Sequence, residues 1–289
     1  MFVLARIASA TVVAALVIVG VAGAANSFSL PDPSGDAGSA PDITSVSVTS
    51  DDNGTLTFRV VVANRKTTLE QDDEVGVYLD LDQNPDTGSL FYGSEVELAF
   101  EGAELQFLKP DNKNRFMAQV PSQPSFLGGF SNGVATFSIK ESDLGLSPTG
   151  GFNLFGAGDN FSNMDTAPDE RTANYQLVPG TAPPVLGHDT RPPYDEAFVA
   201  HGTRGKLVHL SYDAIDGRAM TADTLRVYSR GSVVKTIFFK LQYTDPFGVY
   251  FTRWRAPRHI RGPLKFCVKS LDGGGNVSNT ACAKIVLRG

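Results

Sequence analysis

The chain has 289 residues, of which 42 % are apolar, so it can bury one large core or, as its length favours, two medium ones. It contains 29 Gly and 17 Pro, which is typical of a protein with many short strands and turns. Residues 26–180 hold 23 Asp or Glu against 8 Lys or Arg, whereas residues 181–289 hold 8 against 16. The first part is therefore strongly acidic, which argues against a role in nucleic-acid binding.

The N-terminus is built like a secretory signal peptide. Arg6 precedes an apolar run over residues 7–21, and the small residues 22–24 follow it. This order predicts a signal peptide over residues 1–25. An uncleaved membrane anchor is the alternative, because residues 7–25 are just long enough to span a bilayer. No second long apolar run follows, so we expect the mature chain to be secreted or in the cell envelope, without a stable membrane span.

The acidic part alternates apolar and polar residues in the manner of half-buried β-strands. Nine such runs are separated by clusters of Asn, Asp, Gly and Pro: 43–50, 55–63, 74–81, 95–100, 104–108, 115–120, 134–140, 152–157 and 173–178. This pattern predicts an antiparallel β-sandwich over residues 26–179.

The run "YLDLDQNPDTG" at 78–88 places oxygen-bearing side chains at every second position. Its start matches a calcium-binding EF-hand loop, but Pro85 and Phe91 stand where that loop needs Gly and Glu. A turn at "NPDTG" needs no ion and is the favoured interpretation. Calcium is the alternative, because several carboxylates near one strand end favour a hard cation, with these candidate ligands: Asp80, Asp82, Asn84, Asp86 and Glu95.

Two patterns in the acidic part have a catalytic interpretation. Glu95, Glu97 and Glu101 share one strand face, and retaining glycosidases need two carboxylates about 5.5 Å apart, but any half-exposed strand alternates in this way. "GFSNG" at 129–133 matches the nucleophile-elbow string G-x-S-x-G, but it precedes a strand instead of opening a helix, so we expect a loop. No catalytic residue is predicted, and we do not expect an enzyme.

A Pro-rich stretch, "VPGTAPPV" at 178–185, separates the acidic from the basic part and predicts a linker over residues 180–195. The basic part contains about seven further runs of strand type: near 196–200, then 206–212, 224–230, 232–240, 249–254, 263–269 and 281–287. That number of strands in roughly 100 residues predicts an immunoglobulin-like sandwich over residues 196–289. The predicted fold class is all-β, with two tandem antiparallel β-sandwiches.

The run "RWRAPRHIRG" at 253–262 combines four Arg, one His and the single Trp of the chain. Arg pairs with carboxylates and phosphates, and Trp offers a stacking face, so Arg253, Trp254, Arg255 and Arg258 are candidate contacts to an anionic wall polymer or polysaccharide. The favoured interpretation is that Trp254 ends a strand and fills the sandwich core, while the arginines lie on a loop.

Cys267 and Cys282 flank "SLDGGGNVSNT", whose midpoint falls at Gly274 and Gly275. In a hairpin the two cysteines would lie opposite each other, and the alternation of the flanking strands puts both on the outer face. A disulfide there would close a loop of about 15 residues and stabilise by about 3 kcal/mol in the chain-entropy model. It would agree with an oxidising compartment, whereas two cysteines alone cannot complete a zinc site.

Several motifs carry a resemblance to known domains. "DPSGDAGSAPDITSVSV" at 32–48, "YLDLDQNPDTG" and "DTAPDERTANYQL" at 165–177 resemble a sandwich module of secreted bacterial proteins that is similar to DOMON and family 9 carbohydrate-binding modules. "VHLSYDAIDGR" at 208–218 and the stretch from "RWRAPRHIRG" to "NVSNTAC" resemble bacterial immunoglobulin-like or fibronectin type III-like domains. These motifs bear on fold more than on function.

The first resemblance implies a secreted, non-catalytic module that binds carbohydrate or another cell-envelope ligand. Tyr78, Phe91 and Tyr92, close to the Asp-rich turn, are the aromatic candidates for such a surface. The alternatives are a structural or adhesion spacer without a small-molecule site, with or without stabilising calcium, and, third, a glycoside hydrolase-like enzyme. The expected partner is an extracellular polysaccharide or cell-envelope component, with no nucleic acid and no cofactor other than calcium.

Overall fold

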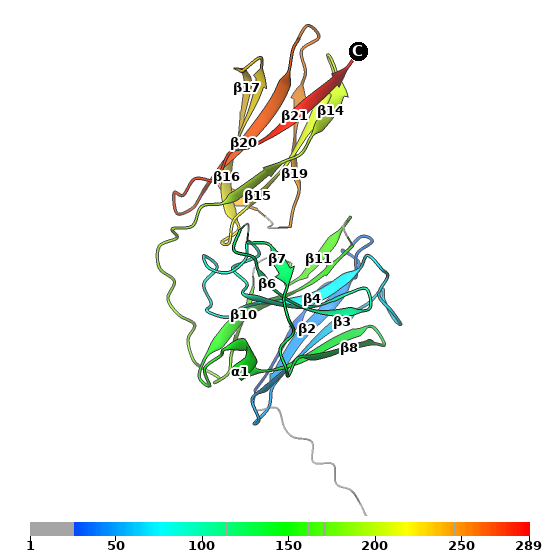
Figure 1. Ribbon diagram of the computed structural model, residues 1–289, viewed down its shortest axis with the longest axis vertical. Coiled ribbons are helices and arrows are strands. Elements are labelled where there is room, and N and C mark those ends of the chain that lie inside the picture. The colour runs from blue at the N-terminus through cyan, green and yellow to red at the C-terminus, as the bar shows by residue number, and fades with distance from the viewer. Residues whose placement is uncertain (1–25, 114, 161, 170–171, 245–246) are drawn as a thin grey trace, which may run out of the picture.

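The computed structural model describes residues 26–289 except 114, 161, 170–171 and 245–246. One end of the second β-sandwich lies against the first β-sandwich, and the C-terminus lies at the other end, far from the first sandwich (Figure 1). The predicted all-β class with two tandem sandwiches is confirmed. The predicted signal peptide, residues 1–25, lies outside the described residues. Within the described part, no helix is long and apolar enough to cross a membrane.

The first sandwich is made of two sheets in which all neighbouring strands run antiparallel. One sheet has the order β1-β2-β3-β9-β8, and the other has the order β11-β10-β4-β5-β6-β7, with β12 paired to β10. The bounds are β1 Asn26–Pro31, β2 Ile43–Ser50, β3 Thr55–Val62, β4 Glu74–Asp80, β5 Val96–Glu101, β6 Glu104–Pro110, β7 Met117–Gln119, β8 Leu127–Ser131, β9 Val134–Lys140, β10 Gly151–Asp159, β11 Met164–Ala167 and β12 Ala173–Gln176. A short helix, α1 Glu141–Leu144, follows β9.

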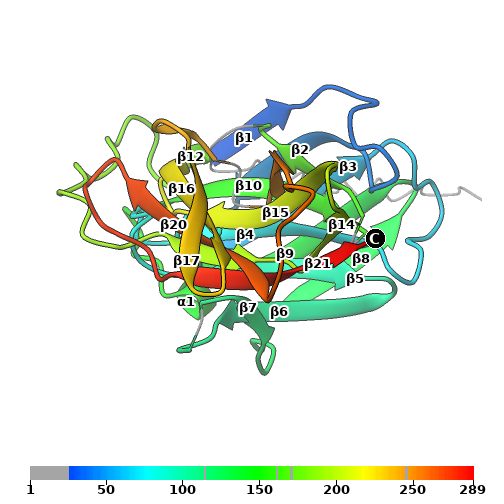
Figure 2. The ribbon, with the colours of Figure 1, turned by 90° about the horizontal axis from the view of Figure 1, so that it is seen from above.

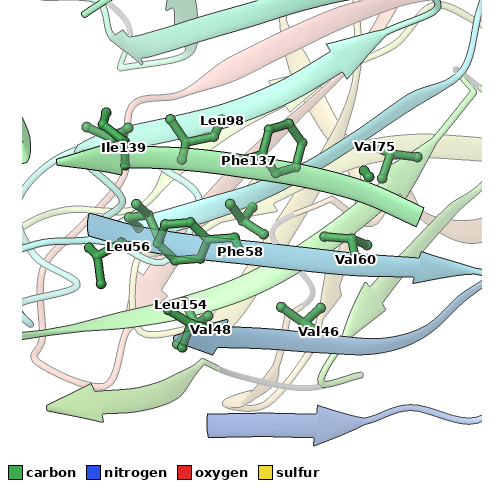
Figure 3. Packing of buried hydrophobic residues seen from close by; sticks show 14 of the residues in the cluster. Val46, Val48, Leu56, Phe58, Val60, Val75, Leu98, Phe137, Ile139 and Leu154 are labelled. Atoms are coloured by element: carbon green, nitrogen blue, oxygen red, sulfur yellow. The ribbon is translucent and has the colours of Figure 1, made fainter. Parts of the chain in front are cut away.

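The core of the first sandwich lies between these sheets (Figure 3). Leu56, Phe58 and Val60 of β3 are fully buried, because every second side chain of a strand points to the same face. Phe58 pairs across the strands with Phe137 and reaches the facing sheet, where its ring centroid lies 5.9 Å from that of Phe152. Truncating such a buried ring costs about 3–5 kcal/mol, so Phe58 contributes substantially to the stability of the first sandwich.

The segment at 129–133, which we expect from the sequence to be a loop, differs in the structure. The "GFSNG" segment is not a loop throughout, because Ser131 ends β8, and Asn132 and Gly133, both with positive φ, form a two-residue hairpin turn into β9. The sequence pattern does not predict β8, because "LGGFS" contains two adjacent glycines and is mostly exposed. Apolar and polar residues therefore do not alternate in it. Ser131 thus lies in a hairpin and not in a strand-to-helix elbow.

The second sandwich is made of a three-stranded sheet, β13-β15-β19, and a sheet of order β14-β21-β20-β16-β17, with β18 paired to β16. Its strands are β13 Tyr194–Ala197, β14 Ala200–Thr203, β15 Leu207–Ile215, β16 Met220–Ser229, β17 Ser232–Phe238, β18 Gln242–Tyr243, β19 Tyr250–Arg255, β20 Leu264–Asp272 and β21 Ala281–Arg288. Neighbours are antiparallel except β14 and β21, which run parallel. Seen along the long axis, these strands overlie the first sandwich (Figure 2). Residues 181–193, between the sandwiches, have no regular secondary structure.

The disulfide follows from the hairpin of β20 and β21. Cys267 and Cys282 lie directly opposite each other and are bonded, so the predicted disulfide is confirmed. Leu264, Phe266 and Val268 are buried, as the alternation predicts. The bridge therefore ties two neighbouring strands together on the side away from the apolar core.

Candidate functional site

The second sandwich rests on the outer face of the sheet that contains β4 and β10. Tyr78 of β4 and Phe155 of β10 stack on this face with ring centroids 4.6 Å apart. Phe247 of the second sandwich stacks on Phe91 at 4.5 Å, and its ring centroid lies 6.0 Å from that of Tyr78. Stacked and edge-on aromatic contacts of this kind stabilise an interface beyond their buried area. Two of the predicted sugar contacts, Tyr78 and Phe91, are thus engaged by the second sandwich and do not form an open surface.

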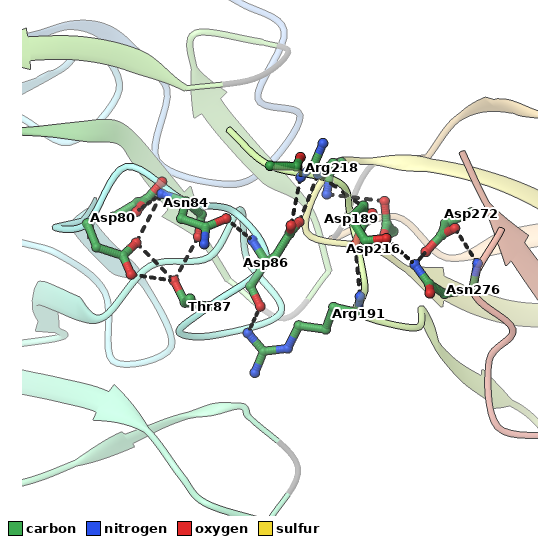
Figure 4. Close-up of polar contacts among 12 residues, drawn as sticks. Asp80, Asn84, Asp86, Thr87, Asp189, Arg191, Asp216, Arg218, Asp272 and Asn276 are labelled. Carbon is green, nitrogen blue, oxygen red and sulfur yellow. Dashed lines mark hydrogen bonds and ion pairs between the residues drawn. The ribbon is translucent and has the colours of Figure 1, made fainter. Parts of the chain in front are cut away.

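A bidentate ion pair joins the sandwiches beside this aromatic cluster. Arg218, in the turn between β15 and β16, donates from Nε to Asp86 Oδ1 at 2.8 Å and from Nη2 to Asp86 Oδ2 at 2.7 Å (Figure 4). Arg191, from the segment between the sandwiches, donates to the Asp86 carbonyl oxygen. The hydrogen bonds to Asp86 raise the pKa of Arg218. The carboxylate of Asp86, one of the predicted metal ligands, is thus paired with Arg218 in this structure.

Three buried carboxylates lie next to the ion pair. Asp189, Asp216 and Asp272 each place one oxygen within 4.8 Å of the others. Burial raises the pKa of Asp216 to about 7 and also raises the pKa of Asp189. The backbone N–H of Arg218 donates to Asp216, the Asn276 N–H donates to Asp272, and Arg218 Nε lies 3.6 Å from Asp189 Oδ2. Arg218 therefore partly neutralises the negative charge of these three carboxylates as well as that of Asp86.

A cavity of about 430 Å³ opens at the boundary between the sandwiches. The Tyr92 and Tyr243 hydroxyls, one from each sandwich, are hydrogen-bonded at 2.7 Å. Asn153 Nδ2 donates to Asp80 Oδ2 at 2.8 Å, and burial raises the pKa of Asp80 to about 8. The lining comes from both sandwiches and includes Asp80, Tyr92, Asn153, Arg218, Met220 and Tyr243. Its volume is that of a small-molecule site.

The structure brings three of the five predicted metal ligands together. Asp80, Asp82 and Glu95 each place a carboxylate oxygen within 4.8 Å of the others, and burial raises the pKa of Glu95 to about 7. Donors of the same loop contact these carboxylates, since the Asn84 N–H donates to Asp80 and Asp82, and the Thr87 hydroxyl lies within hydrogen-bond distance of Asp82 and Glu95. The Asn84 amide oxygen accepts a backbone N–H within the loop. The loop is held by its own hydrogen bonds, and calcium binding stays a prediction.

A second acidic group joins distant parts of the first sandwich. Asp32, Asp36, Asp165 and Asp169 each place an oxygen within 4.8 Å of the others. Burial, together with Asp165 and other neighbouring carboxylates, raises the pKa of Asp32 to about 7, and its Oδ2 has no hydrogen-bond partner among the described residues. Two of the motifs that carry the resemblance of the first part, at 32–48 and 165–177, therefore meet in the fold.

The predicted contact patch at 253–262 is divided in the structure. Trp254 is 6 % exposed and packs in the core of the second sandwich. Arg253 and Arg255, its neighbours in β19, are exposed on the opposite face, and Arg258 is exposed on the following loop. Trp254 lies in the core, as the favoured interpretation states, and does not share one surface with these arginines, because successive side chains of a strand point to opposite faces.

The three glutamates that the sequence places on one strand face, Glu95, Glu97 and Glu101, do not share one environment in the structure. Glu97 is 1 % exposed and its Oε1 has no hydrogen-bond partner among the described residues, whereas Glu101 is exposed. Burial, together with the nearby Glu74, raises the pKa of Glu97 well above its ordinary value. Glu95 precedes the strand, and its Oε2 accepts the backbone N–H of Leu81. The three carboxylates therefore occupy different environments and do not form one surface.

Sequence reasoning missed the residues that the second sandwich contributes, namely Arg218, Tyr243 and Phe247. Their partners lie on the first sandwich, so no local pattern marks them. The sequence signal for contact between the two parts is their opposite net charge, which favours attraction. This signal does not identify the residues that make the contact.

No protein-family model and no curated protein sequence matches the chain. Among solved structures, the chain is similar to the fibronectin(III)-like modules of Clostridium thermocellum CbhA, with 13 % identity over 82 % of this chain and 86 % of that chain, at a TM-score of 0.23. A TM-score this low supports no argument about function. The resemblance of the first sandwich to DOMON and family 9 carbohydrate-binding modules stays a prediction.

Proposed function

We propose that the chain is a non-catalytic binding module of the cell envelope or extracellular space, which holds a carbohydrate in the cavity between its two sandwiches. The observation that carries this proposal is the cavity of about 430 Å³, which residues of both sandwiches line. Small-molecule sites commonly have this size and lie at domain boundaries. A ligand in it would contact both sandwiches and would depend on their docking.

The lining suits the chemistry of a sugar. Tyr92 and Tyr243 supply aromatic rings and hydroxyls, and Asn153 and Arg218 supply further hydrogen-bonding groups. Aromatic rings pack against the C–H faces of a sugar while polar groups bond its hydroxyls. Because burial raises the pKa of Asp80 to about 8, its carboxyl is largely protonated at neutral pH and can donate as well as accept a hydrogen bond.

The lining also favours binding over glycoside hydrolysis. Among the described residues that line the cavity, Asp80 is the one with a carboxyl group. Glycosidases of both common mechanisms use a pair of carboxyl groups that flank the bond to be cleaved. Glu95 comes within 4.8 Å of Asp80 but does not line the cavity. A hydrolase therefore remains the third alternative.

Two features support export. Residues 1–25 have the composition of a signal peptide, and the Cys267–Cys282 disulfide is of the kind that forms in oxidising compartments. The second candidate, a spacer or adhesion unit stabilised by calcium or without it, shares this location but predicts no small ligand. Ligand binding therefore separates the two.

A glycan array probed with residues 26–289 tests the proposal. Met220→Trp places a larger side chain in the cavity, whereas Val286→Trp adds the same ring at a 43 % exposed position of β21. We expect the parent and Val286→Trp to bind the same glycan and Met220→Trp to lose it, with circular dichroism showing that both variants are folded. Absence of any bound glycan, or binding retained by Met220→Trp, would refute the proposal.

A further inference from the structure

The end of the second sandwich farthest from the first collects positive charge. We call it the distal tip, and it consists of the loops 203–206, 229–232 and 255–263 together with the end of β21, where the C-terminus lies in Figure 1. It contains no Asp or Glu and eight basic residues: Arg204, Lys206, Arg230, Arg255, Arg258, His259, Arg261 and Arg288.

Hydrogen bonds between the loops hold these residues at one end. The Arg204 N–H donates to the Arg288 carbonyl oxygen at 3.2 Å, and Arg204 Nε donates to the Ile260 carbonyl oxygen at 3.3 Å. The Arg230 N–H donates to the Pro263 carbonyl oxygen at 3.2 Å. Segments from four places in the sequence therefore converge, and the charge of the distal tip is a product of the fold.

The cations of the distal tip are not neutralised by neighbouring acids. All of them are exposed except Arg204, which is half-buried. In the described part of the chain the ion pairs involve Arg65 and Arg218, and no cation of the distal tip lies within 4.0 Å of a carboxylate. Like charges this close repel one another, so an anion bound among them relieves unfavourable energy.

The acidic residues of the second sandwich lie elsewhere. Asp189, Asp216 and Asp272 form the buried group at the opposite end, beside Asp86 of the first sandwich (Figure 4). Positive charge thus lies at the distal end of the long axis of the molecule, and negative charge lies toward the first sandwich. An anionic partner is attracted to the distal tip and repelled by the acidic first sandwich, which orients the molecule on that partner.

We propose that the distal tip binds an anionic polysaccharide whose repeated carboxylate, sulfate or phosphate groups contact several arginines at once. The planar guanidinium group pairs with each of these anions through two parallel hydrogen bonds. The basic residues are spread over loops that connect the two sheets, so a polymer with repeated charges matches them better than a single small anion. This site goes beyond the proposed carbohydrate cavity and lies at the other end of the second sandwich.

Composition favours a polysaccharide over other polyanions. The three loops contain no Phe, Tyr, Trp or Leu, and their one large apolar residue, Ile260, packs against the core of the second sandwich. Peripheral membrane binding uses such side chains to enter the apolar layer, and binding of single-stranded nucleic acid uses aromatic rings to stack bases. The distal tip presents charged side chains but neither exposed large apolar side chains for a membrane nor aromatic rings for bases. It therefore suits a hydrated polymer whose anionic groups project into solvent.

The test measures binding of residues 26–289 to heparin and polygalacturonate, with neutral dextran as a blank. In one variant three exposed arginines without side-chain hydrogen bonds to carboxylates are reversed together: Arg230→Glu, Arg258→Glu and Arg261→Glu. We expect the parent to bind the charged polymers, and this variant to lose about tenfold or more in affinity. If it fails to fold, as judged by Trp254 fluorescence, the corresponding Gln substitutions take its place.

A matched control reverses three exposed lysines outside the distal tip: Lys235→Glu, Lys240→Glu and Lys269→Glu. It changes the net charge by the same amount, so an equal loss of affinity would overturn the proposal. Failure of the parent to bind either polymer, or tighter binding to phosphatidylglycerol vesicles or to a single-stranded oligonucleotide, would overturn it as well. Met220→Trp should keep polymer binding, which separates this site from the cavity.

Discussion

Removing the charge of Arg218 should loosen the docking of the two sandwiches. Arg218→Met keeps the apolar stem of the side chain but deletes the hydrogen bonds of 2.8 and 2.7 Å to Asp86 and the charge 3.6 Å from Asp189. Asp86 and the buried carboxylates of Asp189, Asp216 and Asp272 would then lie close together without this cation. Their mutual repulsion would add to the lost contacts.

The size of the effect follows from burial and geometry. A hydrogen bond to a charged group contributes about 1.5–3 kcal/mol, whereas an exposed ion pair contributes about 0–1 kcal/mol. The Arg218 side chain is 30 % exposed and that of Asp86 is 14 % exposed, so solvent screening places the pair between these limits. We expect Arg218→Met to lower the free energy of unfolding by about 2 kcal/mol, with a coupling energy of about 1–2 kcal/mol between Arg218 and Asp86.

A double-mutant cycle with Arg218→Met, Asp86→Asn and the combined variant measures this coupling in urea unfolding. Small-angle scattering of the same proteins reports whether the sandwiches separate. Arg65→Met is the matched control, because Arg65 makes a similar bidentate pair with Asp73 at 2.6 and 2.9 Å within the first sandwich. It should lower stability without changing the shape. A coupling energy below about 0.5 kcal/mol would refute the reasoning, since pairs of that strength are typical of freely exposed charges.

Three further measurements test other parts of the structure. Cys282→Ser opens a loop of 15 residues and should lower the stability of the second sandwich by about 3 kcal/mol in urea, while an unchanged midpoint would contradict a constraining disulfide. Burial raises the pKa of Asp195 from 3.8 to about 6, so the folded state binds more protons than the unfolded state between these values, and stability should fall as the pH rises through this window. Asp195→Asn should flatten that part of the melting-temperature profile, and a variant profile identical to the parent's would count against the assignment. If calcium binds the Asp-rich loop, the melting temperature of the parent should rise with calcium concentration more than that of Asp82→Asn, and a flat titration of both would leave the loop as a turn.

Strand positions were predictable because their signal is local. The alternation over 43–50 coincides with β2, and that over 134–140 coincides with β9. The disulfide was predictable for the same reason, since alternation and the glycine-rich midpoint bring Cys267 opposite Cys282. Strand β8 was not predictable in this way, because its two adjacent glycines interrupt the alternation of apolar and polar residues.

The candidate site was predictable only in part. Asp80, Asp82 and Glu95 do come together, because a strand end and the turn after it form a short local unit. Asp86 lies outside this group, because its carboxylate pairs with the guanidinium group of Arg218 on the other sandwich. Phe91 likewise stacks against a residue of the other sandwich, Phe247. Neither partner lies near these residues in the sequence.

The sequence by itself determined the two all-β sandwiches, their opposite charges and the disulfide, because the two-residue period of a strand states which side chains point inward. The sequence does not determine which of the outward-pointing side chains are covered by another part of the molecule. The tertiary structure decided that the outer face around Tyr78 is covered by the second sandwich, that a cavity remains there, and that separate arginines gather at the distal tip. These outcomes depend on surfaces far apart in the chain meeting in space, and no local period encodes such a meeting.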